Sequence, residues 1–412
     1  MKILLVKSRL PYPIRAGEDL VDYGLIKALA EKHEITLIAP VSNPSETMLA
    51  LTELEKYCRR IIPVNIPHDS KVIKRLRQEY NFFIKKIPLE VSDNSSAVLL
   101  EAICRVLENE SFDLCEIEYW FLGDYARRIP AVCPTVLLEI NSIYIDWQRA
   151  SVIRPMPIRR YIRNWFYTHT KLSEFEAGVC RLFDWVLFLS SADLEVVKSN
   201  GGINNSACVI PIPYPIRAVS ETKEKTINNG ILFIGGMRTP YNIDSVRYFC
   251  REILPLIKLR IPNANFTVIG TLPDIKVYRE LEHLGVKFSG FQKDLYSHMR
   301  TFDVLVAPVK CGSGVRTKII EAFSQGMAVV STSMGIEGLL VSPGEDLLVS
   351  DTPEEFAASV IRLLTDNEFR WRISSCALER FKGTYSYKVV SKSTIETYEM
   401  MYEKIMHKKK VL

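Results

Sequence analysis

The feature that most constrains the fold of this chain is a repeated alternation between short β-branched, apolar runs and longer segments of helical period. Such alternation is typical of βαβ units, whose strands pair in parallel sheets covered by helices. One helical segment, residues 18–32, places five apolar side chains on a single face: Leu20, Tyr23, Leu25, Ile26 and Leu29. In the first half of the chain we expect strands at residues 2–8, 34–40, 60–66, 114–119, 135–140, 185–191 and 207–212.

The alternation is interrupted once, between residues 211 and 230, where Pro, polar and charged residues follow one another without a period. A chain of 412 residues also exceeds the size at which one core keeps growing. After the interruption we expect strands at residues 230–236, 265–270, 286–290, 303–309, 328–332 and 346–350. We therefore predict an N-terminal domain over 1–212, a linker over 213–229 and a C-terminal domain over 230–386, with a helix over 387–404 that packs back on the first domain.

Composition and the N-terminus favour a cytoplasmic globular protein. Hydrophobic residues make up 47% of the chain and charged residues 25%, which argues against disorder. No apolar run approaches the roughly 18 residues that a membrane-spanning helix needs. The N-terminal apolar run is interrupted by Lys7 and Arg9, so it is typical of a first strand rather than of a signal peptide.

Cysteine and histidine usage disfavours a disulfide framework and a protein-built metal site. The nine cysteines are scattered singly, without a CxxC pair, and the six histidines show no HExxH spacing. Neither GxxxxGK[ST] nor GxSxG occurs in the sequence, which excludes P-loop phosphotransfer and α/β-hydrolase chemistry. We expect reduced core thiols, no cofactor and no essential metal.

Positive charge is concentrated in a few segments, although the net charge of +5 is modest and does not by itself predict nucleic-acid binding. The basic segments are residues 71–80, 154–166 and 407–410, and the second mixes its cations with aromatic residues. This mixture is typical of contact with an anionic membrane surface or an anionic acceptor. The alternative is a solvated helix face. We expect a cytoplasmic protein with peripheral contact at the inner face of a membrane.

Two cations follow a Gly-Ser-Gly turn at the expected start of a helix. The strand 303–309 leads into Gly312 and Gly314, and Arg316 and Lys318 stand in the first helical turn. Cations at the positive end of a helix dipole are unfavourable unless an anion binds there, and phosphate is the usual anion at such a helix start. The alternative is an exposed ion pair between Lys318 and Glu321, one turn apart. Ile319, Ile320 and Phe323 are expected to face the core.

The segment GSGVRTKIIEAFSQGMAVVSTSMGIEGL, residues 312–339, resembles the nucleotide-sugar site of the family 4 (glycosyl transferases group 1) retaining enzymes. Further similarity lies in FIGGMRTPYNIDSVRYF (233–249), FTVIGTLPD (266–274) and VKFSGFQKDLYSHM (286–299), and more loosely in LPYPIRAGEDL (10–20). The resemblance implies a GT-B fold: an α/β architecture of two Rossmann-like, doubly wound parallel-sheet domains that face each other across a cleft. It also implies a nucleotide-sugar donor, a glycan or lipid-linked acceptor, and a role in cell-surface polysaccharide or glycoconjugate biosynthesis.

Residue by residue, the resemblance implies that Arg316 and Lys318 act on the diphosphate and that Glu321 contacts the donor ribose. The turn at 289–292 would lie beside the nucleobase, and residues 335–339 would border the far side of the donor site. The other donor-binding candidates are Gly17, Gly236, Arg238, Gly290, Phe291, Ser313, Gly314 and Val315, with a surface turn residue as the alternative for Arg238.

At two positions the sequence departs from the common family pattern. Ser313 stands where many relatives carry a sugar-contacting Glu, and Ile140 stands where many carry a His. Glu118, at the end of a strand, and Asn141 are candidates for the acceptor side, with a solvated strand end as the alternative for Glu118. Two other functions stay open: a non-catalytic GT-B protein that binds nucleotide or glycan, and a GT-B sugar-nucleotide epimerase.

Overall fold

The structure, a computed structural model, divides the chain into two compact units. Unit 1 comprises Met1–Tyr214 together with Val390–Leu412, and unit 2 comprises Pro215–Val389. The division assigns most of the expected linker, 213–229, to unit 2. The residues that the structure describes are 1–15, 17–41, 43–66, 76–81, 84, 87–142, 144–145, 148–149, 172–203, 206–211, 214–215, 218–219, 228–292, 294–312 and 314–411.

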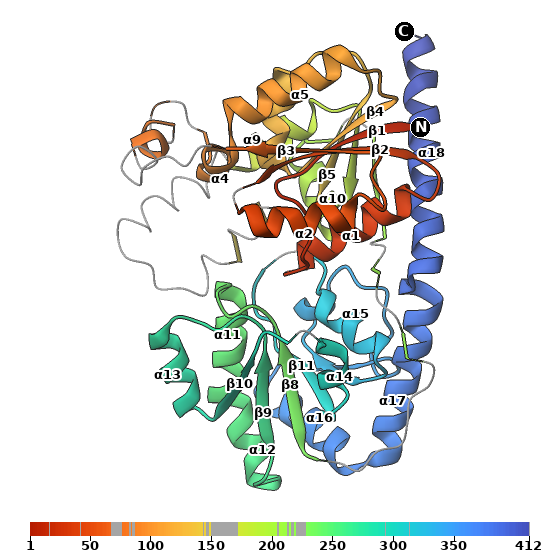
Figure 1. The fold of residues 1–412 in the computed structure, drawn as a ribbon. Coiled ribbons are helices and arrows are strands. Elements are labelled where there is room, and N and C mark those ends of the chain that lie inside the picture. The colour runs from red at the N-terminus through yellow and green to blue at the C-terminus, as the bar shows by residue number, and fades with distance from the viewer. Residues whose placement is uncertain are drawn as a thin grey trace. The chain divides into compact units, whose positions relative to one another are not determined.

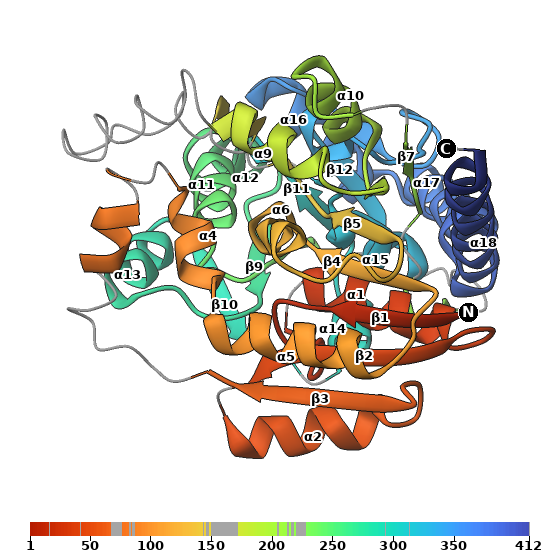
Figure 2. The same cartoon turned by 90° about the horizontal axis from the view of Figure 1, so that it is seen from above.

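Unit 1 is built on a seven-stranded sheet whose strands are all parallel, in the order β3-β2-β1-β4-β5-β6-β7. Figure 2 shows β3, β2, β1, β4 and β5 lying in succession. All seven strands predicted in this half are confirmed, and β2 and β3 pair over the longest register. The strands are β1 (Lys2–Val6), β2 (Glu34–Val41), β3 (Arg60–Asn65), β4 (Leu114–Glu118), β5 (Thr135–Glu139), β6 (Trp185–Phe188) and β7 (Ala207–Val209).

Helices cover both faces of this sheet, with α1 and α5 on opposite sides (Figure 1). The five apolar side chains predicted on one face of α1 are all buried. Ser96 caps α5 by accepting a hydrogen bond from the Leu99 N–H at 3.4 Å, and such a cap satisfies one of the free N–H groups of the first turn. The helices of unit 1 include α1 (Gly17–Leu29), α2 (Pro44–Leu54), α4 (Leu89–Asn94), α5 (Ala97–Asn109), α6 (Trp120–Gly123), α9 (Leu172–Cys180) and α10 (Ser191–Ser199).

The C-terminal helix α18 (Tyr387–Val411) is longer than the predicted 387–404, and from Val390 onward it belongs to unit 1. Tyr398 is buried, and its hydroxyl donates a hydrogen bond to Glu116 on β4. Glu116 also pairs with Lys7, whose Nζ lies 3.0 Å from Glu116 Oε1 and 2.7 Å from Asp22 Oδ1. The C-terminal helix is therefore connected to a buried polar network in the sheet of unit 1.

Unit 2 contains a six-stranded parallel sheet in the order β10-β9-β8-β11-β12-β13. All six predicted strands are present, although β13 covers only two residues. The chain reverses its direction across the sheet between β8 and β11, and in open parallel sheets ligands bind at such a switch point, beyond the carboxyl ends of the strands. The strands are β8 (Gly230–Ile234), β9 (Asn265–Ile269), β10 (Val286–Gly290), β11 (Val304–Ala307), β12 (Ala328–Ser331) and β13 (Leu348–Val349).

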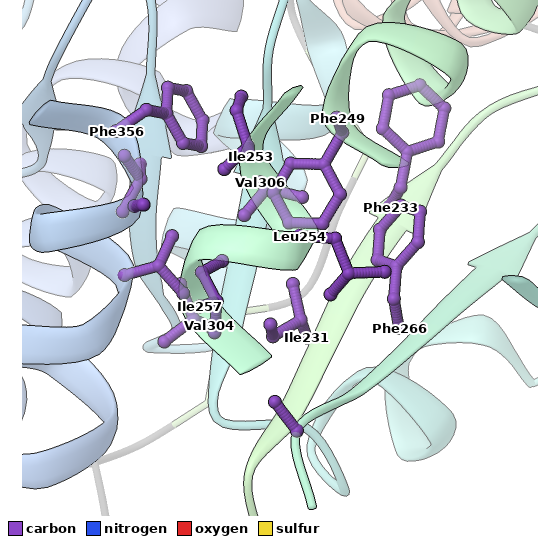
Figure 3. Close-up of a cluster of buried hydrophobic side chains, with 14 of the residues drawn as sticks. Ile231, Phe233, Phe249, Ile253, Leu254, Ile257, Phe266, Val304, Val306 and Phe356 are labelled. Carbon is purple, nitrogen blue, oxygen red and sulfur yellow. The ribbon is translucent and has the colours of Figure 1, made fainter. Parts of the chain in front are cut away.

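The core of unit 2 forms between strand and helix side chains (Figure 3). The rings of Phe249 and Phe266 lie 4.5 Å apart between centroids, and Phe356 contacts Phe249 edge to face at 6.2 Å. These buried rings help to pack the helices of unit 2 against its sheet. The helices that pack here are α11 (Pro240–Tyr248), α12 (Leu254–Arg260), α16 (Pro353–Thr365) and α17 (Asn367–Arg380).

Six of the nine cysteines are buried free thiols, as predicted, whereas Cys376 is exposed. Among the residues that the structure describes, no helix combines the length and the hydropathy required to cross a bilayer.

Candidate functional site

The carboxyl end of β11 leads through a glycine-rich turn into α15 (Thr317–Ser324). Gly312 has φ +105° and Gly314 has φ +73°, values that side chains other than glycine rarely adopt. Arg316 occupies the N-cap position of α15, and its Nη1 donates a hydrogen bond to the Gly314 carbonyl at 2.7 Å. Ile319, Ile320 and Phe323 are buried as predicted. The turn therefore holds a guanidinium at the positive end of a helix that is firmly packed.

Lys318, on α15 after β11, reaches residues on and after β8, the strand on the other side of the switch point. Its ammonium donates a hydrogen bond to Asn242 Oδ1 at 3.0 Å and lies 3.9 Å from the centroid of the Phe233 ring. Asn242 in turn donates through Nδ2 to the Gly236 carbonyl at 3.0 Å. The alternative for Lys318 was an exposed ion pair with Glu321. In the structure its ammonium is bonded to Asn242 instead. Two predicted site residues, Lys318 and Gly236, are brought together by Asn242.

Lys318 and Glu321 both have strongly shifted pKa values. Burial, and secondarily the nearby Arg316 charge, lower the pKa of Lys318 to about 7. Burial raises the pKa of Glu321 to about 7, although the positive charge of Lys318 opposes that shift. The pKa of Tyr296, on α14 (Leu295–Met299), is raised by burial and by the Glu321 carboxylate. The site is therefore poised to gain or lose a proton near neutral pH.

The remaining donor candidates of unit 2 differ in exposure. Arg238 is exposed in the turn after β8, and Gly290, with φ +67°, ends β10. Phe291, which follows directly, exposes 62% of its surface. Val315 is half-buried beside Gly314, and Ser313 lies outside the described residues. Gly290 and Phe291 belong to the edge of the sheet, two strands away from β8.

Unit 1 contains the other predicted residues. Gly17 begins α1, and Asn141, after β5, is half-buried. Glu118 ends β4 but is only 1% exposed, so the alternative of a solvated strand end is wrong. The Ser8 N–H donates to Glu118 Oε2 at 2.8 Å, and burial, followed by the charge of Asp22, raises the pKa of Glu118 well above its usual value. The next residue, Tyr119, has φ +62°, which is strained for a residue with a side chain.

Similarity to known proteins assigns the domain that holds the cationic turn. The family model for glycosyl transferases group 1 matches residues 228–366, a range that contains every candidate residue of unit 2. This chain is a glycosyltransferase with a group 1 domain. Its two parallel-sheet Rossmann-like units and its structural similarities identify the fold as GT-B.

The glycosyltransferase is similar to solved structures over nearly its whole length. HepE from Anabaena, crystallised with UDP and glucose, superposes with a TM-score of 0.66 at 14% identity and covers 97% of this chain and 100% of its own. The sucrose-phosphate synthase of Thermosynechococcus elongatus superposes with a TM-score of 0.69 at 14% identity, covering 98% of this chain and 99% of its own. At these identities the similarity is evidence for the fold alone.

Two relatives resemble the glycosyltransferase in sequence. A 44.6 kDa protein in the cps region of Klebsiella pneumoniae is 22% identical over 372 residues, which are 87% of this chain and 90% of the relative. The phosphatidyl-myo-inositol mannosyltransferase of Mycolicibacterium smegmatis is 27% identical over 152 residues, which are 35% of this chain and 39% of the relative.

The structure gives the unexpected Ile140 of the glycosyltransferase a packing role, because its side chain is only 7% exposed. The adjacent Glu139 is fully buried and accepts a hydrogen bond from the Trp120 N–H at 3.0 Å. Position 140 is thus occupied by an apolar core residue rather than by a polar group available to a substrate.

The sequence did not identify Asn242, Phe233 and Tyr296 as site residues. Asn242 lies 76 positions from Lys318, and nothing in the local sequence pattern pairs the two. The segment that contains Asn242 follows β8, and the segment that contains Lys318 follows β11. Because these two strands flank the switch point, their positions could have indicated that the two segments meet.

Proposed function

We propose that this glycosyltransferase moves a sugar from a nucleotide-sugar donor to a hydroxyl group of a glycan, lipid-linked or other acceptor, with retention and without an essential metal. The observation that carries the proposal is the placement of Arg316 and Lys318 at the start of α15. Both cations add to the positive end of the helix dipole, and burial already disfavours the charge of Lys318. A diphosphate bound at this turn would make both charges favourable.

The chemistry follows from the charge that must be stabilised. When the bond between the anomeric carbon and the phosphate oxygen breaks, negative charge grows on the leaving diphosphate, and preorganised cations stabilise that charge. Arg316 and Lys318 would supply the cations, and Glu321 would accept hydrogen bonds from the ribose hydroxyls. The acceptor oxygen forms the new bond on the face that the diphosphate leaves, and a phosphate oxygen takes the acceptor's proton. No protein nucleophile is required by this route.

Names of similar proteins support the substrate classes within this proposal. Structures of HepE contain UDP and UDP-glucose, and one sequence relative lies in a cps region. A uridine-based donor and a role in cell-surface polysaccharide or glycoconjugate biosynthesis are consistent with both. We include a lipid-linked acceptor and peripheral contact with an anionic membrane in the proposal; the basic-aromatic segment 154–166 lies outside the described residues.

The proposal is tested by incubating the enzyme with a panel of nucleotide sugars and measuring thermal stabilisation and release of nucleoside diphosphate. A ligand at 100 times its dissociation constant adds about 2.7 kcal/mol of stability. Nucleotide-sugar binding without turnover to free diphosphate would favour the non-catalytic alternative, and a sugar epimer still attached to the nucleotide would favour the epimerase.

The site assignment has a matched control within unit 2. The Arg316→Ala/Lys318→Ala variant should bind nucleoside diphosphate more weakly, by about 1.5 to 3 kcal/mol for each lost charged contact. The Lys258→Ala/Arg260→Ala variant removes the same two side-chain types from the exposed end of α12, which precedes the amino end of β9. Its affinity should equal that of the wild type. Equal affinity of the Arg316→Ala/Lys318→Ala variant would refute the site.

A further inference from the structure

Asn242 joins the two segments that meet at the switch point of unit 2. It lies in the first turn of α11, which follows β8, whereas Lys318 lies on α15, which follows β11 (Figure 1). Its amide has a partner on each side: Oδ1 accepts a hydrogen bond from the Lys318 ammonium at 3.0 Å, and Nδ2 donates to the Gly236 carbonyl at 3.0 Å. Because an ammonium only donates and a carbonyl only accepts, these partners fix the orientation of the amide.

The turn after β8 leaves room for the Asn242 amide. A Cβ at position 235 would lie 2.8 Å from Asn242 Nδ2 and 2.9 Å from its Cγ, so only glycine lets the amide rest against the backbone there. The Gly235 N–H donates to the Ile269 carbonyl at 2.9 Å, which ties this backbone to β9. The amide therefore packs against a fixed surface and can hold the lysine in one position.

The side chain of Lys318 has a possible partner on its own helix. Glu321 lies one turn further along α15, and a lysine and a glutamate three residues apart can form an ion pair. Such a pair would neutralise the cation that an anion needs. Asn242 is uncharged, so it holds the ammonium beside the Phe233 ring without cancelling its charge. An ammonium has three N–H donors, and Asn242 accepts one of them, so the others can be donated to phosphate oxygens.

We propose that Asn242 is a positioning residue of the diphosphate site, which directs the Lys318 ammonium to the anion and keeps it from Glu321. The inference rests on the proposed function, because the anion is the diphosphate of the donor. A neutral amide suits this role: its oxygen accepts from the ammonium without offsetting the charge, and its NH2 group anchors it to the Gly236 carbonyl. Neither Asp nor Leu, which are close to Asn in size, can do both.

Among the described residues, the charges that act on Lys318 belong to α15 and its N-cap. Burial has the largest effect on the pKa of Lys318 and lowers it, the charge of Arg316 lowers it further, and the charge of Glu321 raises it. The contacts from β8 and α11 are the Phe233 ring and the amide, which are uncharged. The phenol of Tyr296, on α14, is influenced by Glu321. A charge introduced at position 242 would therefore act on Lys318 from a new direction.

Asn242→Asp and Asn242→Leu should shift the protonation of Lys318 in opposite directions. The Asp carboxylate favours the ammonium and should raise the pKa of Lys318, whereas Leu removes the accepting oxygen and should lower it further. Both variants should bind nucleoside diphosphate at least about tenfold more weakly at pH 7. Asp weakens binding because its charge offsets that of the lysine, and Leu because the ammonium is no longer held. A loss of packing alone would not separate the two variants in this way.

The protonation of Lys318 is measured without a ligand. The full chain is treated with acetic anhydride at a series of pH values, and acetylation of Lys318 is quantified by mass spectrometry. Only the neutral amine reacts, so the pH of half-maximal labelling follows the pKa of Lys318. This pH should be higher than the wild-type value in Asn242→Asp and lower in Asn242→Leu. Isothermal titration calorimetry with nucleoside diphosphate on the same proteins gives the affinities.

Asn265 provides the matched control, because it is also half-buried and its Nδ2 donates to the Asn229 carbonyl at 3.3 Å, at the amino end of β9. Asn265→Asp should leave the labelling of Lys318 and the affinity unchanged. Equal labelling profiles of the two Asn242 variants, wild-type affinity in both, or the same effect in Asn265→Asp would overturn the role of Asn242. If one Asn242 variant does not fold, the direction of the shift in the other decides. A wild type that binds no nucleoside diphosphate would instead refute the proposed function, and with it the diphosphate role of Asn242.

Discussion

Binding of nucleoside diphosphate should weaken steeply above neutral pH because Lys318 loses its proton there. The pKa of Lys318 is lowered to about 7 by burial and by Arg316, so the folded protein disfavours the charged form. An anion binds the protonated form, and raising the pH above 7 removes that form. The ligand's own charge is constant in this range, since the terminal phosphate loses its last proton at a pKa of about 6.

The size of the effect follows from this single ionisation. If only protonated Lys318 binds, the apparent dissociation constant scales with one plus the ratio of neutral to charged lysine, and it rises about 25-fold between pH 7.5 and pH 9. If the neutral amine retains part of the contact, the rise is limited by the value of one charge-assisted hydrogen bond, which is about 1.5 to 3 kcal/mol. Glu321 is already mostly ionised at pH 7.5, because its pKa is about 7, and contributes little to the change.

Isothermal titration calorimetry with nucleoside diphosphate at a series of pH values measures the effect. The Lys318→Met variant is the control, because Met keeps an apolar chain against the Phe233 ring but carries no proton to lose. Its affinity should be low and nearly independent of pH. Two outcomes would refute the reasoning: a wild-type affinity that changes less than about threefold, or the same pH dependence in Lys318→Met.

Two further predictions concern stability. Lys7→Met should lower the free energy of unfolding by about 3 to 5 kcal/mol in urea denaturation, because it leaves the carboxylates of Asp22 and Glu116 buried without their cation; a loss below about 1 kcal/mol would contradict the role of the network. Gly335→Ala should cost about 1 to 3 kcal/mol, because its Cβ would lie 2.1 Å from Ser331 Oγ and 3.1 Å from the Ala307 carbonyl; an unchanged melting temperature would show that Ser331 moves aside without cost.

The strands could be predicted from the sequence because strands in parallel sheets are buried on both faces. A buried strand of this kind is a continuous apolar run, as Val304–Ala307 and residues 328–330 are, and the run is visible without any knowledge of its neighbours. The positive φ values of Gly312 and Gly314 were predictable for a similar reason, since glycine itself marks the conformation. These features depend on local residues only.

Helix ends and polar partners were less predictable. The helix predicted over 387–404 continues to Val411, because Lys408, Lys409 and Lys410 lie in its last turn, where cations interact favourably with the helix dipole. Glu118 was expected at the acceptor side, with a solvated strand end as the alternative. The structure contradicts the solvated alternative, because Glu118 is buried near Lys7 and Asp22 and accepts a hydrogen bond from the Ser8 N–H. Its environment depends on residues from two other elements, and the alternation of apolar and polar residues carries no information about such contacts.

The cations behind the Gly-Ser-Gly turn raised the question of how a helix start tolerates them without a bound anion. The structure answers it for Lys318 through two contacts and a pKa shift. Asn242 accepts its hydrogen bond, and the Phe233 ring lies beneath its charge. Burial lowers the pKa of Lys318 to about 7, so that part of the population is neutral near pH 7. A bound diphosphate would reverse the last effect by drawing a proton onto the lysine. The buried positive charge of Lys318 destabilises the empty site and attracts an anion. A substitution that removes this charge, such as Lys318→Met, should therefore stabilise the empty site and weaken the binding of an anion.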